Sequence, residues 1–214
     1  MIVTIVGAGA MARGIATIAL AGGHTVRLID RTPEKAAALA DELRQAAPDG
    51  DVGQSDAIAV EDADLVVLAL PYPKGRDVVA EYGTALTGSV VVDICNPVDF
   101  TTFDSLAVPP GTSAAEQIAA DAAPGAPVVK AFNTTFATAL LAGQVAGKPL
   151  DVFIAGDDEA GKNAVAELAT GGGLRPLDVG PLRRARELEG FQFLHMAVQE
   201  RLNLNWSSAI KILP

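Results

Sequence analysis

Three small residues near the start of the chain have the spacing of a phosphate-binding loop. The stretch VGAGAMARG places Gly7, Gly9 and Ala12 in a G-x-G-x-x-A pattern. In such a loop the first glycine permits a tight turn, the second lets the backbone approach a pyrophosphate, and the third small residue lets a helix pack closely on a strand. The N-terminus of that helix offers free N–H groups and a partial positive charge to phosphate oxygens. The pattern therefore predicts dinucleotide binding, provided that a strand precedes it and a helix follows.

The stretch IDRTPEK carries side chains that distinguish between two dinucleotides. Asp30 is typical of NAD sites, because a carboxylate at this position accepts hydrogen bonds from the ribose hydroxyls. Arg31 is typical of NADP sites, because a guanidinium pairs with the 2′-phosphate. Thr32 and Lys35 lie close by in the sequence. These residues favour NADP narrowly and leave NAD open.

The elements that must position these residues follow from the alternation of apolar β-branched runs with helical patterns. We expect strands at 2–6, 25–30, 64–71, 89–97, 126–132, 149–156 and 174–180. Helices are expected from the glycine loop to about Leu20 and over 34–47, 74–86, 113–122, 158–170 and 182–205. Such alternation predicts an α/β protein with a Rossmann-type, doubly wound, mostly parallel sheet. We divide it into a dinucleotide-binding domain (1–133) and a small C-terminal α/β lobe (134–214).

Composition excludes several other classes of protein. The 214 residues carry a net charge of −10, which argues against nucleic-acid binding. One cysteine and two distant histidines exclude an internal disulfide framework and the usual zinc spacings. No apolar run reaches the ~18 residues of a membrane span, and the N-terminus has the pattern of a strand and not of a signal peptide. We expect a cytoplasmic protein.

The sequence offers no evident acid or base for catalysis. His195 lies on an apolar helical face, where a packed histidine is the common case, and Cys95 ends a strand without a sign of activation. The pattern Y-x-x-x-K of carbonyl reductases does not occur. A site of this kind suits direct hydride transfer between two stacked rings, where the protein supplies positioning and shielding from water. The second ring would belong to a flavin or a deazaflavin.

Five stretches together resemble a known family: GAGAMARG, DICNP, VVKAFNT, FIAGDDEA and GLRPLDVGPL. They are similar to the NADPH-dependent reductases of coenzyme F420, the F420:NADP oxidoreductases, and to the NADPH-binding domain of the STEAP metalloreductases. The resemblance covers nearly the whole chain and implies hydride transfer between NADP(H) and coenzyme F420. Two places depart from the family: Asp30 stands where a small polar residue is frequent, and the loop DFTTFDSL matches weakly.

The resemblance and the strand ends together give a set of expected contacts. For the dinucleotide they are Gly7, Ala8, Gly9, Ala10, Met11, Ala12, Asp30, Arg31, Thr32, Lys35, Leu70, Pro71, Tyr72, Asn96, Ala131 and Asn133. For the deazaflavin they are Asn133, Thr134, Val179, Gly180, Pro181 and Leu182. Basic side chains for its phosphate and carboxylates would come from Lys130, Lys148, Arg183, Arg184 and Arg186. The same arginines also fit a solvated helix start with Arg–Glu pairs.

The last expected helix has apolar residues at helical spacing, namely Phe191, Leu194, Val198 and Leu202. This face fits either a homodimer contact, as the resemblance implies, or a cover for the sheet. Two rival functions also stay open at this point. One is an NAD(P)H-dependent reductase of FMN, FAD or another small acceptor, and the other is a regulatory protein that binds NADP(H) without turnover.

Overall fold

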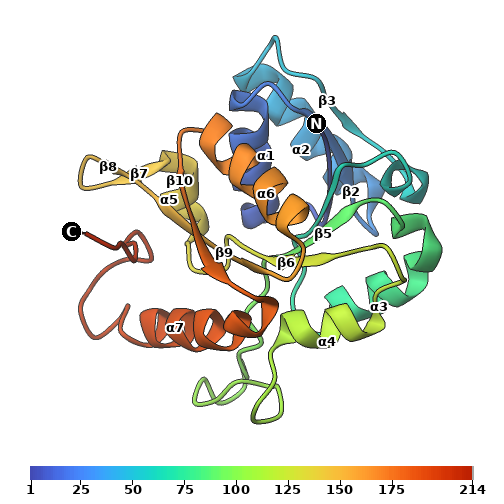
Figure 1. Ribbon diagram of the computed structural model, residues 1–214. Helices are drawn as coiled ribbons and strands as arrows, with labels where there is room; N and C mark the ends of the chain where they lie inside the picture. The colour runs from blue at the N-terminus through green and yellow to red at the C-terminus, as the bar shows by residue number, and fades with distance from the viewer. Residues whose placement is uncertain (214) are drawn as a thin grey trace.

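The computed structural model describes residues 1–213, and its centre is one eight-stranded sheet in the order β10-β9-β6-β5-β4-β1-β2-β3 (Figure 1). The strands are β1 (Ile2–Val6), β2 (Thr25–Ile29), β3 (Val52–Gln54), β4 (Leu65–Leu68), β5 (Val90–Asp93), β6 (Val128–Lys130), β9 (Asp151–Gly156) and β10 (Arg175–Gly180). Every neighbouring pair is parallel except β6 and β9. The predicted Rossmann-type, mostly parallel sheet is confirmed.

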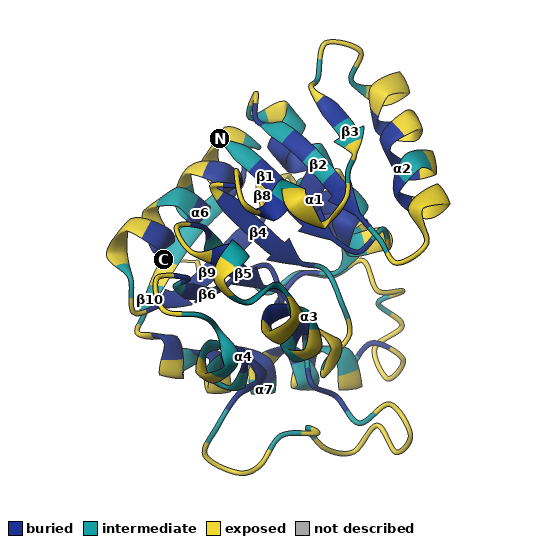
Figure 2. Ribbon diagram, turned by 90° about the vertical axis from the view of Figure 1, so that its right-hand side faces the viewer, coloured by how far each residue is buried: buried dark blue, intermediate teal, exposed yellow. Residues whose placement is uncertain are grey.

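Helices cover both faces of the sheet (Figure 1). One layer holds α1 (Ala10–Ala21), α2 (Pro33–Ala46), α5 (Ala137–Ala142) and α6 (Glu159–Gly171), and the other holds α3 (Lys74–Tyr82), α4 (Ala114–Asp121) and α7 (Ala185–Ala197). Figure 2 shows the burial that results: the central strands are buried, while the outward sides of α2 and α3 are exposed. Parallel strands covered on both faces are nearly continuous runs of apolar residues, as IVTIV and LVVL are.

Three elements were missed by the sequence prediction. The strand β3 has only three residues, and α5 is a six-residue helix. The hairpin of β7 (Gln144–Val145) and β8 (Lys148–Pro149) has two residues on each side. Each is too short for a periodic pattern to stand out. Their existence depends on tertiary packing, as the many contacts between α1 and α5 indicate.

The predicted helix over 182–205 is wrong at both ends. A single 3-10 turn, η3 (Leu182–Arg184), precedes α7, which ends at Ala197. Residues 203, 205 and 206 adopt positive φ angles, which cannot continue a helix. The tail then returns to the sheet, where the backbone N–H of Ile212 and the Nζ of Lys211 donate to the carboxylate of Asp151.

The helix expected over 74–86 is also divided. It ends at Tyr82, and Gly83 begins the 3-10 turn η2 (Gly83–Leu86) with a φ of 48°. Among residues 1–213, no helix has both the length and the apolar composition to cross a bilayer.

Candidate site for a dinucleotide and an electron acceptor

The glycine loop has the geometry that phosphate binding needs. Gly7 has a φ of 112°, and a Cβ on it would lie 2.4 Å from the backbone oxygen of Ala69. Only glycine fits there. A Cβ on Gly9 would meet no atom of the described residues within 4 Å, so this side of the loop faces open space. The first turn of α1 holds no acidic side chain that would repel an anion, and the N–H groups at the start of a helix favour anion binding.

The next small residues of the loop serve packing, as the motif predicts. Ala12 is fully buried in the core between α1 and the sheet, whereas Ala10 is exposed and Met11 is half-buried. Gly14 lies against α5, where a Cβ would come within 2.8 Å of the Leu140 side chain. Of the predicted loop contacts, Gly7, Ala8 and Gly9 therefore line the open side, and Ala12 supports the helix from behind.

Asp30 is bound to the loop itself. Its Oδ2 accepts a hydrogen bond from the backbone N–H of Ala8 at 3.1 Å, and its Oδ1 accepts one from the N–H of Thr32 at 2.9 Å. Arg31 and Lys35 are exposed beside it. Within the described part of the chain, neither forms an ion pair. The end of β2 thus presents two free cations and a carboxylate whose two oxygens already have partners.

These residues line a pocket of about 960 Å³. The predicted contacts that it brings together are Gly7, Ala8, Gly9, Asp30, Arg31, Thr32, Lys35, Leu70 and Pro71. The prediction missed Gln54, which is the last residue of β3, and Ser55 after it. It also missed Lys74 and Tyr82 of α3. Tyr72 is not part of this lining: its hydroxyl donates to Oε1 of Gln117 in α4 at 2.6 Å.

A second group of predicted residues meets where β5 and β6 end. The Nδ2 of Asn96 donates to the backbone oxygen of Asn133 at 2.9 Å, and the Nδ2 of Asn133 donates to Oδ1 of Asn96 at 3.0 Å. Two buried acceptors, Oδ1 of Asn133 and Oγ1 of Thr134, have no hydrogen-bond partner among residues 1–213. Buried polar atoms are rarely left unpaired, so this edge of the sheet is suited to a ligand that donates hydrogen bonds.

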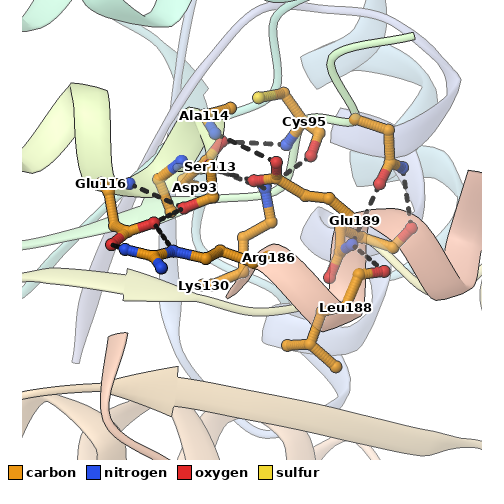
Figure 3. A network of polar contacts seen from close by, with 12 residues as sticks. Asp93, Cys95, Ser113, Ala114, Glu116, Lys130, Arg186, Leu188 and Glu189 are labelled. Atoms are coloured by element: carbon orange, nitrogen blue, oxygen red, sulfur yellow. Dashed lines mark hydrogen bonds and ion pairs between the residues drawn. The ribbon is translucent and has the colours of Figure 1, made fainter. Parts of the chain in front are cut away.

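Lys130 is not part of a basic patch, which corrects one expectation from the sequence. Its side chain is fully buried, and its Nζ lies 2.8 Å from Oδ2 of Asp93, 2.8 Å from Oε1 of Glu189 and 2.6 Å from the backbone oxygen of Cys95 (Figure 3). Burial opposes the charge, but the neighbouring carboxylates outweigh it and raise the pKa of Lys130. This ammonium is committed to the protein interior.

The other candidate cations are also mostly engaged. Arg184 pairs with Glu187, and Arg186 pairs with Glu116. The interpretation of this stretch as a helix start with Arg–Glu pairs is thus confirmed for Arg184, while Arg186 reaches across to α4. Arg183 and Lys148 form no ion pair within residues 1–213.

The turn after β10 places its residues at the same level of the sheet as the end of β6. Gly180 aligns with Ala155 of β9, which aligns with Lys130. The φ of Gly180 is 101°, which requires glycine, and the Gly180 N–H donates to the Asp178 carboxylate. Val179 is half-buried and Pro181 is exposed, whereas Leu182 is buried in the core. The structure thus gives the Leu182 side chain a packing role.

The two side chains that the sequence analysis set aside as unreactive are both buried. His195 bonds to Gln192 and to the Ser208 hydroxyl, and burial lowers its pKa. For Cys95, burial raises the pKa of the thiol well above its usual value, which keeps it protonated. Neither has the surroundings of a general acid or a nucleophile.

Known proteins with this architecture support a specific family. Residues 2–97 match the family described as NADP oxidoreductase, coenzyme F420-dependent. The F420-dependent NADP reductase of Methanocaldococcus jannaschii is 29% identical over 194 residues, which cover 86% of this chain and 85% of that protein. A solved structure from Arthrobacter sp. FB24, whose assignment as an F420-dependent NADP reductase is provisional, is 27% identical with a TM-score of 0.80 over 99% of both chains.

A second kind of relative is much longer. The metalloreductase STEAP3 of Rattus norvegicus is 32% identical over 187 residues, which cover 87% of this chain but 35% of that protein. The chain thus spans about a third of the metalloreductase. Residues 2–97 thus match the family of coenzyme F420-dependent NADP oxidoreductases, and nearly the whole chain is similar in sequence and in fold to F420-dependent NADP reductases.

Proposed function

We propose that this protein transfers a hydride between NADP(H) and coenzyme F420. The observation that carries the proposal is a pair of complementary features along the carboxyl ends of the parallel strands. One is the glycine loop beside two free cations, and the other is a group of buried acceptors without partners. Dinucleotides bind across the carboxyl ends of such strands. The match of residues 2–97 to the F420-dependent family and the similarity to F420-dependent NADP reductases support coenzyme F420 as the second substrate.

The nucleotide end of the site is suited to NADP(H). The N–H groups at the start of α1 would bind the pyrophosphate, and Arg31 and Lys35 would bind the 2′-phosphate. Asp30 need not repel that phosphate strongly, because the Ala8 and Thr32 N–H groups hold its carboxylate. The Asp30 carboxylate is also compatible with NADH as a weaker substrate.

The nicotinamide end would lie between the end of β4 and the ends of β5 and β6. Leu70 and Pro71 would form one wall, and Asn96, Ala131 and Asn133 the other. The free Oδ1 of Asn133 could accept a hydrogen bond from a carboxamide N–H, which would satisfy a buried atom that is otherwise unpaired. The nicotinamide supplies the hydride chemistry when it is bound, so the protein needs to orient the ring and exclude water.

The acceptor wall would come from the C-terminal lobe. Thr134, Val179, Gly180 and Pro181, with the backbone at Leu182, would stand opposite the nicotinamide. Ring-to-ring transfer requires no acid or base at this wall, and both His195 and Cys95 are buried in other roles. The division into residues 1–133 and 134–214 therefore describes two walls of one proposed cleft.

A flavin is the second candidate acceptor. Coenzyme F420 carries a phosphate and carboxylates, yet three of the five candidate cations are engaged in ion pairs. A less charged acceptor such as FMN would need fewer basic side chains.

We also propose that two copies of the chain form a homodimer through α7 and the segment after it. Phe191 is 44% exposed, and Leu194 and Leu202 are each 61% exposed on one side of this region. Clustered apolar exposure of this kind marks a protein contact. The other face of α7 already covers the sheet through Leu188.

The experiment that tests the function follows NADPH and NADH oxidation by absorbance, with F420 and FMN offered in parallel. Loss of the deazaflavin band with NADPH is the expected result. Turnover with FMN alone would show that the protein reduces a flavin and not coenzyme F420. If NADPH binds but no acceptor is reduced, hydride transfer to these acceptors is refuted and a regulatory role is favoured.

A further inference from the structure

The buried ammonium of Lys130 joins four elements at one point. Asp93 is the last residue of β5 and Lys130 is the last residue of β6. Glu189 comes from α7, and its carboxylate also accepts hydrogen bonds from the N–H groups of Ala114 at 3.0 Å and Ala115 at 3.4 Å. Two strand ends, the start of α4 and the middle of α7 thus converge on three charged side chains (Figure 3).

The segment that follows Lys130 is strained and held from both sides. Phe132 is fully buried and has a φ of 59°, a conformation that aromatic residues rarely adopt. Such strain persists only where the surroundings enforce it. Lys130 anchors the chain two residues before Phe132, and the Nδ2 of Asn133 donates to the backbone oxygen of Leu188 one residue after it. Adjacent residues of α7, Leu188 and Glu189, are therefore bound by the two ends of this turn.

Stability alone is a weak reason for a charged cluster at this place. A buried ion pair is expensive to desolvate, and apolar side chains of similar volume often stabilise a protein equally well. An apolar side chain could not, however, direct three donors onto the Glu189 carboxylate: the Lys130 ammonium and the N–H groups of Ala114 and Ala115. The ionic cluster therefore fixes the position of α7 relative to the end of β6 and the start of α4, whereas apolar packing would allow α7 to shift.

We propose that Lys130 is a positioning residue for the electron acceptor. Its ammonium holds α7 and the loop 132–135 against the carboxyl edge of the sheet, and so sets the spacing between the nucleotide wall and the acceptor wall. This inference rests on the proposed function, because the spacing between the two walls matters for catalysis only if a hydride passes between them. The pocket at the end of β2 is built from other elements, so the cluster does not touch the proposed phosphate end of the nucleotide site.

The test compares three variants. K130M leaves two buried carboxylates without their cation, and it is expected to be less stable. D93N/K130M/E189Q removes all three charges and leaves no buried charge without a partner, so we expect it to fold without the ionic cluster. K211M is the matched control, because it also removes a lysine that bonds to a fully buried aspartate, while Arg175 remains to pair with Asp151.

Two readouts separate positioning from simple stability. The first is turnover with whichever of F420 and FMN the wild type reduces, together with the dissociation constant for NADPH. In the triple variant we expect kcat to fall by about ten- to a hundredfold, as displacement of a reacting group by about 1 Å can cause. NADPH affinity should fall much less, because the glycine loop, Arg31 and Lys35 at the other end of the dinucleotide site are untouched. The second is amide hydrogen exchange, which should become faster over 132–135 and 185–197 but not over 10–21.

The outcomes are distinct. A triple variant with the kcat of the wild type would overturn the proposal, as would equal losses in NADPH affinity and turnover. If the wild type reduces neither acceptor, the proposed function fails, and hydrogen exchange still decides whether the cluster holds α7. Unchanged exchange over 185–197 would then refute the inference, and faster exchange would support it. K211M should match the wild type in kcat and in NADPH affinity.

Discussion

Removal of the two free cations at the end of β2 should change the choice of dinucleotide. Arg31 and Lys35 are exposed and unpaired within residues 1–213, so they lose no internal partner when they are replaced by alanine. We therefore expect R31A and K35A to fold as the wild type does. The substitutions should weaken the binding of NADPH, which carries the 2′-phosphate, and not the binding of NADH.

The magnitude follows from the exposure of these side chains. A charge pair at ~4 Å is worth about 1 kcal/mol in water and up to about 4 kcal/mol near a protein surface. Because both cations are exposed, a value near 1.4 kcal/mol for each is reasonable, and this corresponds to about a tenfold change. R31A should raise the KM for NADPH about tenfold and R31A/K35A about a hundredfold, with the KM for NADH nearly constant.

Steady-state kinetics with both dinucleotides measure this directly. R44A is the matched control, because Arg44 is an exposed arginine that pairs with Asp41 at the far end of α2. It should leave both KM values unchanged. Equal losses with NADH and NADPH in R31A/K35A would refute the reasoning, because they would show that the two cations do not bind the 2′-phosphate.

Three other perturbations give separate tests. G7A should lower the free energy of unfolding by ~2 kcal/mol or more and abolish NADPH binding, since φ is 112° and the Ala69 oxygen lies 2.4 Å from the new Cβ. Burial raises the pKa of Asp151, but Arg175 and Lys211 outweigh it and lower the value to about 2. The stability advantage over D151N should thus be complete above about pH 4 and vanish as the pH falls through about 2 in acid titrations. L194E should convert a dimer to a monomer in light scattering, and a wild-type monomer would refute the contact.

Much of the fold could be predicted because it depends on local patterns. The run IVTIV and the glycine loop fix the first strand, the turn and the helix in register. The helix expected over 34–47 is α2, which begins at Pro33 after Thr32, although the Thr32 hydroxyl makes no capping bond within the described residues. The dinucleotide pocket follows from the same patterns, since its walls are the ends of consecutive parallel strands.

Residues that depend on distant partners could not be predicted in this way. Lys130 has the sequence context of a strand-end cation, and nothing local indicates that Glu189, 59 residues away, reaches it. The tail shows the same limitation. The apolar spacing of Val198 and Leu202 fits a helix, but the bonds from His195 and Gln199 to Ser208 turn the chain back after Ala197.

Asp30 shows how a residue type can point in the wrong direction when its partners are unknown. In the sequence its carboxylate indicates NAD, because ribose hydroxyls are its usual donors at that position. In the structure two backbone N–H groups, from Ala8 and Thr32, already occupy its oxygens. A ribose hydroxyl would have to compete with both of these bonds, and release of the Ala8 bond would disturb the loop that binds the pyrophosphate. The Asp30 side chain is therefore best explained as a support for the glycine loop, in keeping with the proposal that Arg31 and Lys35 recognise the 2′-phosphate.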